Sequence, residues 1–386
     1  MRTQAFNAFR SVSLSLLLCP LSLFSRNLVA GEVVSWGSNR YGQTNAPPDL
    51  TRVVAIAAGY AHSLALRADG TVAAWGDRSY GQIPAPIGLT NVVAVAAGDL
   101  HSLALKSDGT VVAWGAGTAN LGTWPDLGQS LVPSSLTNVV AISGGALHSL
   151  ALKSDGTVVA WGDNYFGQTN LPPSLTNVVA IAAGGFHNLA LRRDGTVVAC
   201  GDSYSGQTDL PAGLTSLVAI AGGRFHSLAL RTDGTVIGWG ETRVPEQIAN
   251  VVAIAAGEDV CLALRADGTL DFWYFGFYLV DPGSPPVGLT NVAAISTKGG
   301  PGDGLALIGD APPQLQAPLA DPLRSGRTFS ISLPTRSGRV YALEFKNSLS
   351  DSSWTALPLV AGNSGLLRLT DSSATGAQRF YRVRQW

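Results

Sequence analysis

The sequence predicts an all-β protein built from one repeated unit, and three features of the chain support this. First, the tripeptide Asp-Gly-Thr recurs 34 to 47 residues apart, with its aspartates at Asp69, Asp108, Asp155, Asp194, Asp233 and Asp267. Second, a short apolar run of the Leu-Ala-Leu type precedes each tripeptide, and a run of the Val-Val-Ala-Trp type follows it. Third, the unit recurs with a period near 40 residues and contains short strands and glycine-rich turns. This combination is typical of β-propellers. We therefore expect a β-propeller, followed by a small β-sandwich-like domain.

The hairpin is the central element of each unit. In residues 148–162, the two apolar runs are joined by Asp155-Gly156, a dipeptide that favours a hairpin because glycine accepts positive φ. A further strand precedes the hairpin, as in residues 53–56, and such continuously apolar runs predict sheets that are buried between neighbouring sheets. Each unit must end on the side of the propeller where it began, so we expect an even number of strands in each unit. The Gln-Thr-Asn-Leu-Pro-Pro type of segment is the predicted fourth, edge strand, where proline is tolerated.

The Trp-type strands predict seven units. They start at Val33, Val72, Val111, Val158, Val197, Val236 and Leu270. The first Trp-type strand has no Leu-Ala-Leu run before it, and the last run, at 305–308, has no Trp-type strand after it. Asp310 and Gly31 match the two halves of one interrupted turn. We therefore expect the N-terminal strand to pair with the last one, which closes a seven-bladed ring and removes its exposed edges.

These motifs resemble the repeat of the regulator of chromosome condensation family, a seven-bladed propeller. The matching elements are Gly-Gly-x-x-His-Ser-Leu-Ala-Leu, Asp-Gly and Trp-Gly-x-Asn-x-x-Gly-Gln, and they cover residues 31–310. Segment 161–169 is most similar to secreted bacterial members, which include a propeller that inhibits β-lactamases through an aromatic-rich face. The eukaryotic founder of the family is a nuclear guanine-nucleotide exchange factor. The resemblance implies the fold and transfers neither activity.

The N-terminal residues 1–30 have the features of a secretory signal peptide. Arg2 and Arg10 flank the start, and an apolar run at 12–24, too short for a membrane span, leads to a cleavage site near Ala30. We therefore expect a protein that is secreted or held in the cell envelope, either in the periplasm or at the cell surface.

A proline-rich linker is expected at 311–325, and a small C-terminal β domain at 326–386. This domain resembles C-terminal domains of exported bacterial proteins. Alternating residues predict strands at 329–333, 340–345, 365–369 and 379–383. Anchoring, sorting and capping are open roles for it.

Composition and motifs argue against several classes of function. A net charge of −1 with 13% charged residues does not favour nucleic-acid binding, which needs clustered Lys and Arg. No catalytic or phosphate-binding motif is found, so we expect no enzymatic activity and no cofactor. The aspartates of Asp-Gly-Thr are expected to be turn residues and not calcium ligands.

The histidines and cysteines are expected to have structural roles. All the histidines occupy one repeat position, at His62, His101, His148, His187 and His226. Because each lies on a separate unit, they cannot converge on one metal, and we expect each to bond a nearby backbone group. Cys200 replaces a Trp and Cys261 replaces a Ser, two units apart, so we expect packing substitutes and no disulfide.

Strand direction defines a candidate binding face. The turn before each His-type strand and the loop after each Trp-Gly pair leave the same side of the ring, whereas the Asp-Gly turns leave the other side. The first side gathers large apolar residues, and an insertion at 117–130, which is either a specificity loop or a tolerated insertion, adds one Trp. The candidate partner-binding residues are Tyr41, Tyr60, Tyr80, Leu100, Trp124, Leu147, Tyr165, Phe166, Phe186, Tyr204 and Phe225.

Exposed aromatic clusters are typical of protein interfaces, and the alternative for any single residue is packing between units. We therefore expect an exported, monomeric, non-catalytic protein that binds another protein through this face. Two alternatives stay open: inhibition of a secreted or periplasmic enzyme such as a β-lactamase, and carbohydrate binding at the cell surface. Exchange on a small GTPase would need an intracellular location, which the signal peptide contradicts. The identity of the partner is not encoded in any motif.

Overall fold

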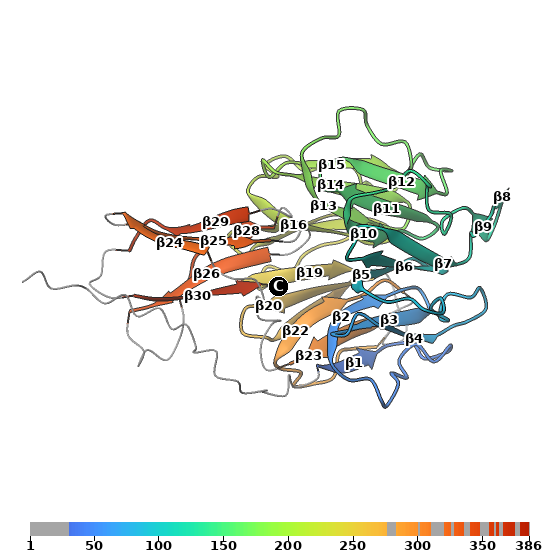
Figure 1. Cartoon of the computed structure of the whole chain (residues 1–386), viewed down its shortest axis with the longest axis horizontal. Coiled ribbons are helices and arrows are strands. Elements are labelled where there is room, and N and C mark those ends of the chain that lie inside the picture. Colours follow the sequence, from blue (N-terminus) through green and yellow to red (C-terminus); the bar gives the residue numbers. More distant parts are fainter. Residues whose placement is uncertain are drawn as a thin grey trace, which may run out of the picture.

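The computed structural model describes residues 31–275, 283–299 and 302–309, and, in the C-terminal part, 320–325, 328–335, 340–347, 355–358, 360–362, 366–374 and 379–385. The regular structure of these residues is entirely β-strand (Figure 1). Among them, no helix is long and apolar enough to cross a membrane. The predicted signal peptide and residues 311–319 of the predicted linker lie outside the described residues.

Six repeats each form an antiparallel sheet of three consecutive strands. They are β2–β4 (Val53–Ala58, His62–Arg67, Val72–Gly76), β5–β7 (Val92–Ala97, His101–Lys106, Val111–Gly115), β10–β12 (Val139–Gly144, His148–Lys153, Val158–Gly162), β13–β15 (Val178–Ala183, His187–Arg192, Val197–Gly201), β16–β18 (Leu217–Gly222, His226–Arg231, Val236–Gly240) and β19–β21 (Val251–Ala256, Val260–Arg265, Leu270–Tyr274). A further sheet joins the two ends of this region in the order β1-β23-β22, where β1 is Glu32–Trp36, β22 is Val292–Ser296 and β23 is Gly304–Ile308. Its strand β1 pairs antiparallel with β23, from Glu32 opposite Ile308 to Trp36 opposite Gly304.

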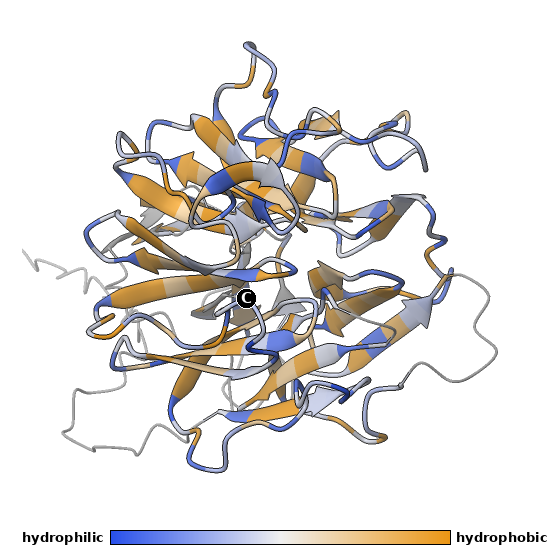
Figure 2. Cartoon of the chain, turned by 90° about the vertical axis from the view of Figure 1, so that its right-hand side faces the viewer, coloured by the Kyte–Doolittle hydropathy of each residue, from blue (hydrophilic) through white to orange (hydrophobic). Residues whose placement is uncertain are grey.

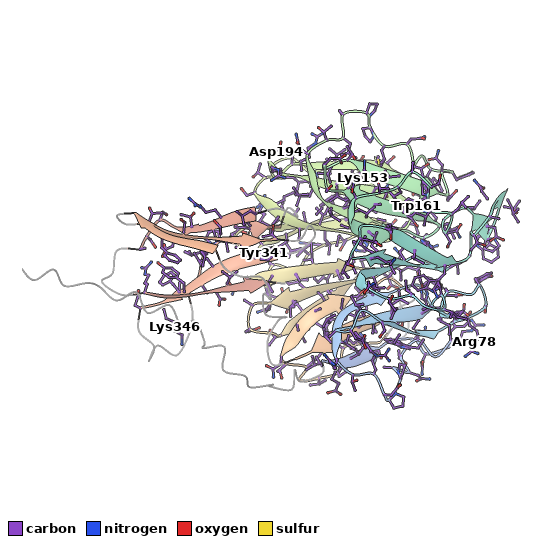
Figure 3. The ribbon with its side chains drawn as sticks, viewed as in Figure 1. Arg78, Lys153, Trp161, Asp194, Tyr341 and Lys346 are labelled. Atoms are coloured by element: carbon purple, nitrogen blue, oxygen red, sulfur yellow. The ribbon has the colours of Figure 1, made fainter. Side chains whose placement is uncertain are left out.

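The hairpin turns follow the predicted chemistry. In the turn between β11 and β12, Gly156 has a φ of 81°, a region that residues with a Cβ rarely adopt. The carboxylate of Asp155 accepts hydrogen bonds from the backbone N–H and the hydroxyl of Thr157, at 3.0 and 2.6 Å. Asp194 belongs to an equivalent turn and lies toward the end of the molecule that holds the C-terminal strands, whereas Arg78, in the loop after β4, lies at the other end (Figure 3). The Asp-Gly turns and the Trp-side loops therefore lie on opposite faces.

The hydrophobic core lies between neighbouring sheets. The first strand of each repeat sheet contacts that of the next, from β2 through β5, β10, β13, β16 and β19 to β22, and β22 in turn contacts β2. The middle strands are fully enclosed, so that Leu64, Leu103 and Leu150 are at most 1% exposed. Each such leucine contributes about 1.5–3 kcal/mol to folding.

The predicted fourth strand is wrong, because the connecting segments form turns. After β4, the N–H of Gly81 donates to the carbonyl of Arg78, and that of Leu89 to the carbonyl of Pro86. Prolines in the segment have no N–H to give to a ladder. Side chains of the next sheet hold the segment in place instead.

A single backbone carbonyl in the connecting segment accepts the hydrogen bonds that hold it to the next sheet. In the segment after β4, the carbonyl of Gln82 accepts hydrogen bonds from the Ser102 hydroxyl at 2.9 Å and from the Trp114 indole at 2.8 Å. Both donors belong to the next sheet, β5–β7. Four of the sheets are thus joined to the segment before them by their own Ser and Trp, and a fourth strand is not needed.

The histidines also link neighbouring sheets, and they bond side chains instead of the backbone groups we expected. Each Nε2 lies 2.8–3.1 Å from a polar atom in the next sheet, in the pairs His62–Ser102, His101–Ser149, His148–Asn188, His187–Ser227 and His226–Cys261. All five imidazoles are buried. Cys261 replaces a serine in this role, and both Cys200 and Cys261 are free thiols.

The C-terminal strands form two small sheets. One contains β24 (Ala320–Ser325), β25 (Thr328–Pro334) and β29 (Leu366–Asp371); the other contains β26 (Val340–Lys346), β27 (Thr355–Ala356), β28 (Val360–Ala361) and β30 (Phe380–Gln385). Their shared core includes Phe329, Ile331, Leu333, Tyr341 and Leu343. Strand β24 pairs with β25, so residues 320–325 of the predicted linker are part of a sheet.

The C-terminal strands pack against the repeat sheets. Ala342 of β26 belongs to the same hydrophobic cluster as Val218 and Val252 of β16 and β19, and β28 lies against β16. Figure 1 shows these strands at the left, with the hairpin of β8 (Asn120–Thr123) and β9 (Asp126–Leu127) at the opposite end. The face opposite the C-terminal strands is therefore the one predicted to bind a partner.

Candidate protein-binding face

Aromatic rings from different repeats meet on this face. The ring centroids of Phe166, in the loop after β12, and Phe186, in the turn between β13 and β14, are 5.2 Å apart. Tyr165 packs edge-on against Phe166 at 4.8 Å. This confirms the geometric expectation that the Trp-side loops and the turns before the histidines emerge together. Figure 2 looks onto this face and shows the sheets arranged around a common centre.

The insertion at 117–130 places Trp124 on a projecting hairpin. Strands β8 and β9 pair with each other in a two-stranded sheet of their own. Trp124, between them, is 63% exposed and packs its ring edge-on against Tyr80, with 5.6 Å between the centroids. The insertion therefore extends the aromatic surface outward from the ring of sheets.

All eleven candidate residues are at least partly accessible to solvent. The exposed ones are Tyr41, Tyr60, Trp124, Tyr165, Phe166 and Tyr204, and the half-buried ones are Tyr80, Leu100, Leu147, Phe186 and Phe225. Tyr165 and Tyr204 are 85% and 94% exposed, so packing between sheets does not account for these two. Phe186 and Phe225 are partly covered by the Arg224 guanidinium, which lies 5.5 and 5.6 Å from their ring centroids. We call these eleven residues the aromatic face.

Charged side chains that no sequence motif indicated meet at the centre of the aromatic face. The Arg224 guanidinium lies 3.3 Å from the Glu258 carboxylate and 3.8 Å from that of Asp99. The Lys298 ammonium donates to the carbonyl of Gly144. Arg224 and Asp99 belong to sheets that are not neighbours, and so do Lys298 and Gly144. These side chains therefore connect sheets that do not pack directly against each other.

We call Tyr60, Asp99, Arg224, Glu258 and Lys298 the axial cluster. Each follows the end of the first strand of its sheet by two residues, and the equivalent residues of the other two sheets are Ala146 and Gly185. Backbone hydrogen bonds link neighbouring turns, as from the N–H of Asp99 to the carbonyl of Ala146. The signal that could have identified the cluster is variation at one turn position within an otherwise uniform repeat.

The charges of the axial cluster are partly removed from water. Burial raises the pKa of Asp99, and Lys298 and Arg224 oppose that rise. Burial likewise raises the pKa of Glu258, with Arg224 acting in the opposite direction, and lowers the pKa of Lys298. Low solvation strengthens the interaction of these groups with any charge brought to the face.

Two further acids lie beside the axial cluster. Asp303 occupies the histidine position of its sheet, where its carboxylate accepts hydrogen bonds from the Gln43 amide and the backbone N–H of Ser38, and burial raises its pKa to about 7. Asp259 is 3% exposed. Within the described residues, no three His, Cys, Asp or Glu side chains are grouped closely enough to hold a metal ion.

Comparison with known proteins identifies the repeat. Five segments, at 53–82, 92–120, 139–168, 178–207 and 217–242, match the family described as "Regulator of chromosome condensation (RCC1) repeat". These five segments are therefore similar to RCC1 repeats, and the repeated three-stranded sheets are consistent with an RCC1-like propeller. No curated protein matches it significantly.

Solved structures support the same fold. Prp20p from Saccharomyces cerevisiae, described with its binding to Gsp1p and histones, is 20% identical over 73% of this chain and 92% of its own, with a TM-score of 0.62. Yeast RCC1 (Prp20) bound to Kap60 is 19% identical over 80% of this chain and 95% of its own, with a TM-score of 0.60. Human WBSCR16 is 17% identical over 72% and 99%, with a TM-score of 0.55. At these identities the likeness concerns the fold alone.

Proposed function

We propose that the protein is an exported, non-catalytic binding protein that engages a protein partner through the aromatic face. The observation that carries this proposal is the contiguous cluster of Tyr165, Phe166 and Phe186, in which Tyr165 is 85% exposed. Solvent-exposed aromatic rings are costly on a free surface and are enriched among the residues that dominate binding energy. Prp20p is described as binding Gsp1p and histones, and yeast RCC1 as bound to Kap60, which supports a protein as the class of partner.

A rigid scaffold is part of the proposal. We infer a seven-bladed ring in which β1 completes the last blade, because β1 pairs with β23 and the sheets contact one another from β2 round to β22. A closed ring holds the loops of the aromatic face in fixed positions before binding. Such preorganisation lowers the entropy that association costs.

Two narrower forms of the proposal have observations of their own. The projecting β8–β9 hairpin, with Trp124 at its turn, has the shape of an element that enters a cleft, and this favours inhibition of a secreted or periplasmic enzyme such as a β-lactamase. The same exposed indole could instead stack on a sugar ring, which favours a glycan ligand. Activity assays with purified β-lactamases and a glycan array separate these two from a general scaffold.

The test is a comparative pull-down from the envelope and culture medium of the producing organism. The baits are the full chain and a variant with Tyr165→Ala, Phe166→Ala, Phe186→Ala and Phe225→Ala. A control bait carries Ile87→Ala and Val287→Ala, two fully exposed apolar residues outside the aromatic face. We expect a protein retained by the full chain and the control and lost by the aromatic variant. Equal retention by all three baits would place binding elsewhere and contradict the proposal.

A further inference from the structure

We propose that the centre of the aromatic face is a receptor for a cationic side chain of the partner, a lysine ammonium or an arginine guanidinium. The receiving groups are the carboxylates of Glu258 and Asp99, supported by the buried carboxylates of Asp259 and Asp303. This inference rests on the proposed function, because the cation would belong to the protein bound on the aromatic face.

The local charges do not balance. In the described part of the chain, three acids (Asp99, Glu258 and Asp259) and Asp303, whose pKa is raised to about 7, interact with two cations, Arg224 and Lys298. Arg224 lies between Asp99 and Glu258, at 3.8 and 3.3 Å, and so serves both of them. Lys298 donates to a backbone carbonyl on the far side of the centre. The centre of the face therefore carries an excess of negative charge.

Asp259 gives the strongest indication that this centre receives a cation from the partner. It is 3% exposed, and neither of its carboxylate oxygens has a hydrogen-bond partner. The carboxylate is close enough to raise the pKa of both Glu258 and Asp303, so it lies within the acidic group. A buried carboxylate without a partner is strongly unfavourable, which means that the free protein tolerates this residue at a cost.

Comparison with the other repeats indicates that the carboxylate of Asp259 is not needed for folding. The equivalent position immediately before the His-type strand holds Ala61, Leu100, Leu147, Phe186 and Phe225 in the other repeats. One repeat has thus replaced an apolar residue with an acid, next to the charged axial cluster. An apolar or neutral residue would serve the fold better at this position.

The chemistry favours an organic cation over a metal ion. The acids come from three sheets, with Glu258 and Asp259 in the same turn, and they are not grouped closely enough for metal coordination. An ammonium or guanidinium on a long stem donates several hydrogen bonds over a wider span. Tyr60, which is 36% exposed at the edge of the cluster, offers a ring for the aliphatic stem to pack against.

The first test measures the stability of the free, full-length chain. We expect Asp259→Asn to raise the melting temperature, because it removes an unpaired buried charge and leaves a shape of the same size. The control is Asp49→Asn on an exposed turn, which should leave the melting temperature unchanged. A lower melting temperature for Asp259→Asn would show a structural role for this carboxylate and overturn the inference.

The second test uses Nα-acetyl-lysine methylamide as the probe and the uncharged Nα-acetyl-norleucine methylamide as its control, with amide chemical shifts as the readout. We expect a saturable shift at Tyr60, Asp99 and Glu258 with the lysine probe alone, lost in Asp259→Asn and in Glu258→Gln. Equal responses to both probes, or no response, contradict the inference. The probe does not require the partner, so this result stands apart from the pull-down that tests the proposed function.

Discussion

Each buried histidine ties the stability of the protein to pH. Burial lowers the pKa of His62 and His148 to about 4, and that of His187 and His226 to about 3. The ordinary pKa of a histidine in an unfolded chain is about 6.5. Below pH 6.5 the unfolded chain therefore binds protons that the folded chain does not, and the folded state loses stability as the pH falls.

We expect the buried neutral imidazole of His62 to make its full contribution to the free energy of unfolding above the pKa of an unfolded histidine. That contribution should disappear as the pH falls toward the folded-state pKa of about 4. Urea unfolding at a series of pH values checks this against His62→Gln. Between these limits the wild type should lose stability more steeply than the variant, by up to about 1.4 kcal/mol per pH unit. The comparison is needed because the raised pKa of Asp303 acts in the opposite direction. Parallel curves for the two proteins would contradict the expectation.

One repeat departs from the others at two residues that compensate each other. Cys200 stands at the Trp position and Asn188 at the Ser position. The Asn188 amide donates a hydrogen bond to the carbonyl of Gln168. In other repeats the equivalent carbonyl accepts hydrogen bonds from a serine hydroxyl and a tryptophan indole. A small cavity beside these two residues is lined by Val198, Cys200 and neighbouring leucines.

We expect the pair Asn188→Ser and Cys200→Trp to restore the common arrangement and to stabilise the protein by about 1–2 kcal/mol. Thermal unfolding of the double variant measures the gain. Cys200→Ala serves as the control and should lower stability. A double variant that is less stable than the wild type would mean that the surrounding leucines cannot make room for the indole.

Among the elements, β1 is the strand that we expect to hold the two ends of the repeat region together, because it pairs with β23. Trp36 on β1 is 6% exposed, and Trp161 in the middle of the chain is 7% exposed. If β1 is an integral part of the ring, Trp36→Ala should cost about 3–5 kcal/mol, as Trp161→Ala should. Chemical denaturation of both variants checks this. A loss below about 1 kcal/mol for Trp36→Ala alone would show that β1 is dispensable.

The β8–β9 hairpin is expected to serve recognition and not stability. Its strands pair only with each other in the described part of the chain, and Trp124 is 63% exposed. Trp124→Ala should therefore change the free energy of unfolding by less than about 0.5 kcal/mol and weaken ligand binding by about 1 kcal/mol or more. Denaturation and isothermal titration with the captured partner measure the two effects. A large loss of stability with unchanged binding would reverse this assignment.

At the scale of the whole molecule, the C-terminal strands cover part of the face opposite the aromatic face. Val179, Val218 and Val252, at the second position of their strands, are 3–4% exposed, whereas Val54 at the equivalent position is 36% exposed. Val218 and Val252 share a hydrophobic cluster with Ala342 of β26. The coverage is therefore one-sided and leaves the aromatic face open.

Truncation after residue 310 should expose the covered valines, lower the melting temperature and increase the binding of a hydrophobic dye. Partner binding should persist, because the aromatic face lies on the other side. Scanning calorimetry and a pull-down with the truncated chain measure the two properties. Loss of the partner with an intact melting temperature would show that the C-terminal strands take part in binding.

The sequence by itself determined the three strands of each repeat sheet, the Asp-Gly turns and the pairing of β1 with β23. These features depend on local turn chemistry and on the alternation of apolar residues, both of which are readable along the chain. The C-terminal strands were located for the same reason, apart from β24, β27 and β28.

Only the tertiary structure decided how the sheets are joined and what lies at their centre. Side chains of Ser102 and Trp114 fasten the preceding segment to their sheet, so no fourth strand forms. Asp99 and Arg224 lie far apart in the sequence and meet because the ring brings their turns to one point. That approach depends on the packing of all the sheets together, which no local pattern of residues encodes.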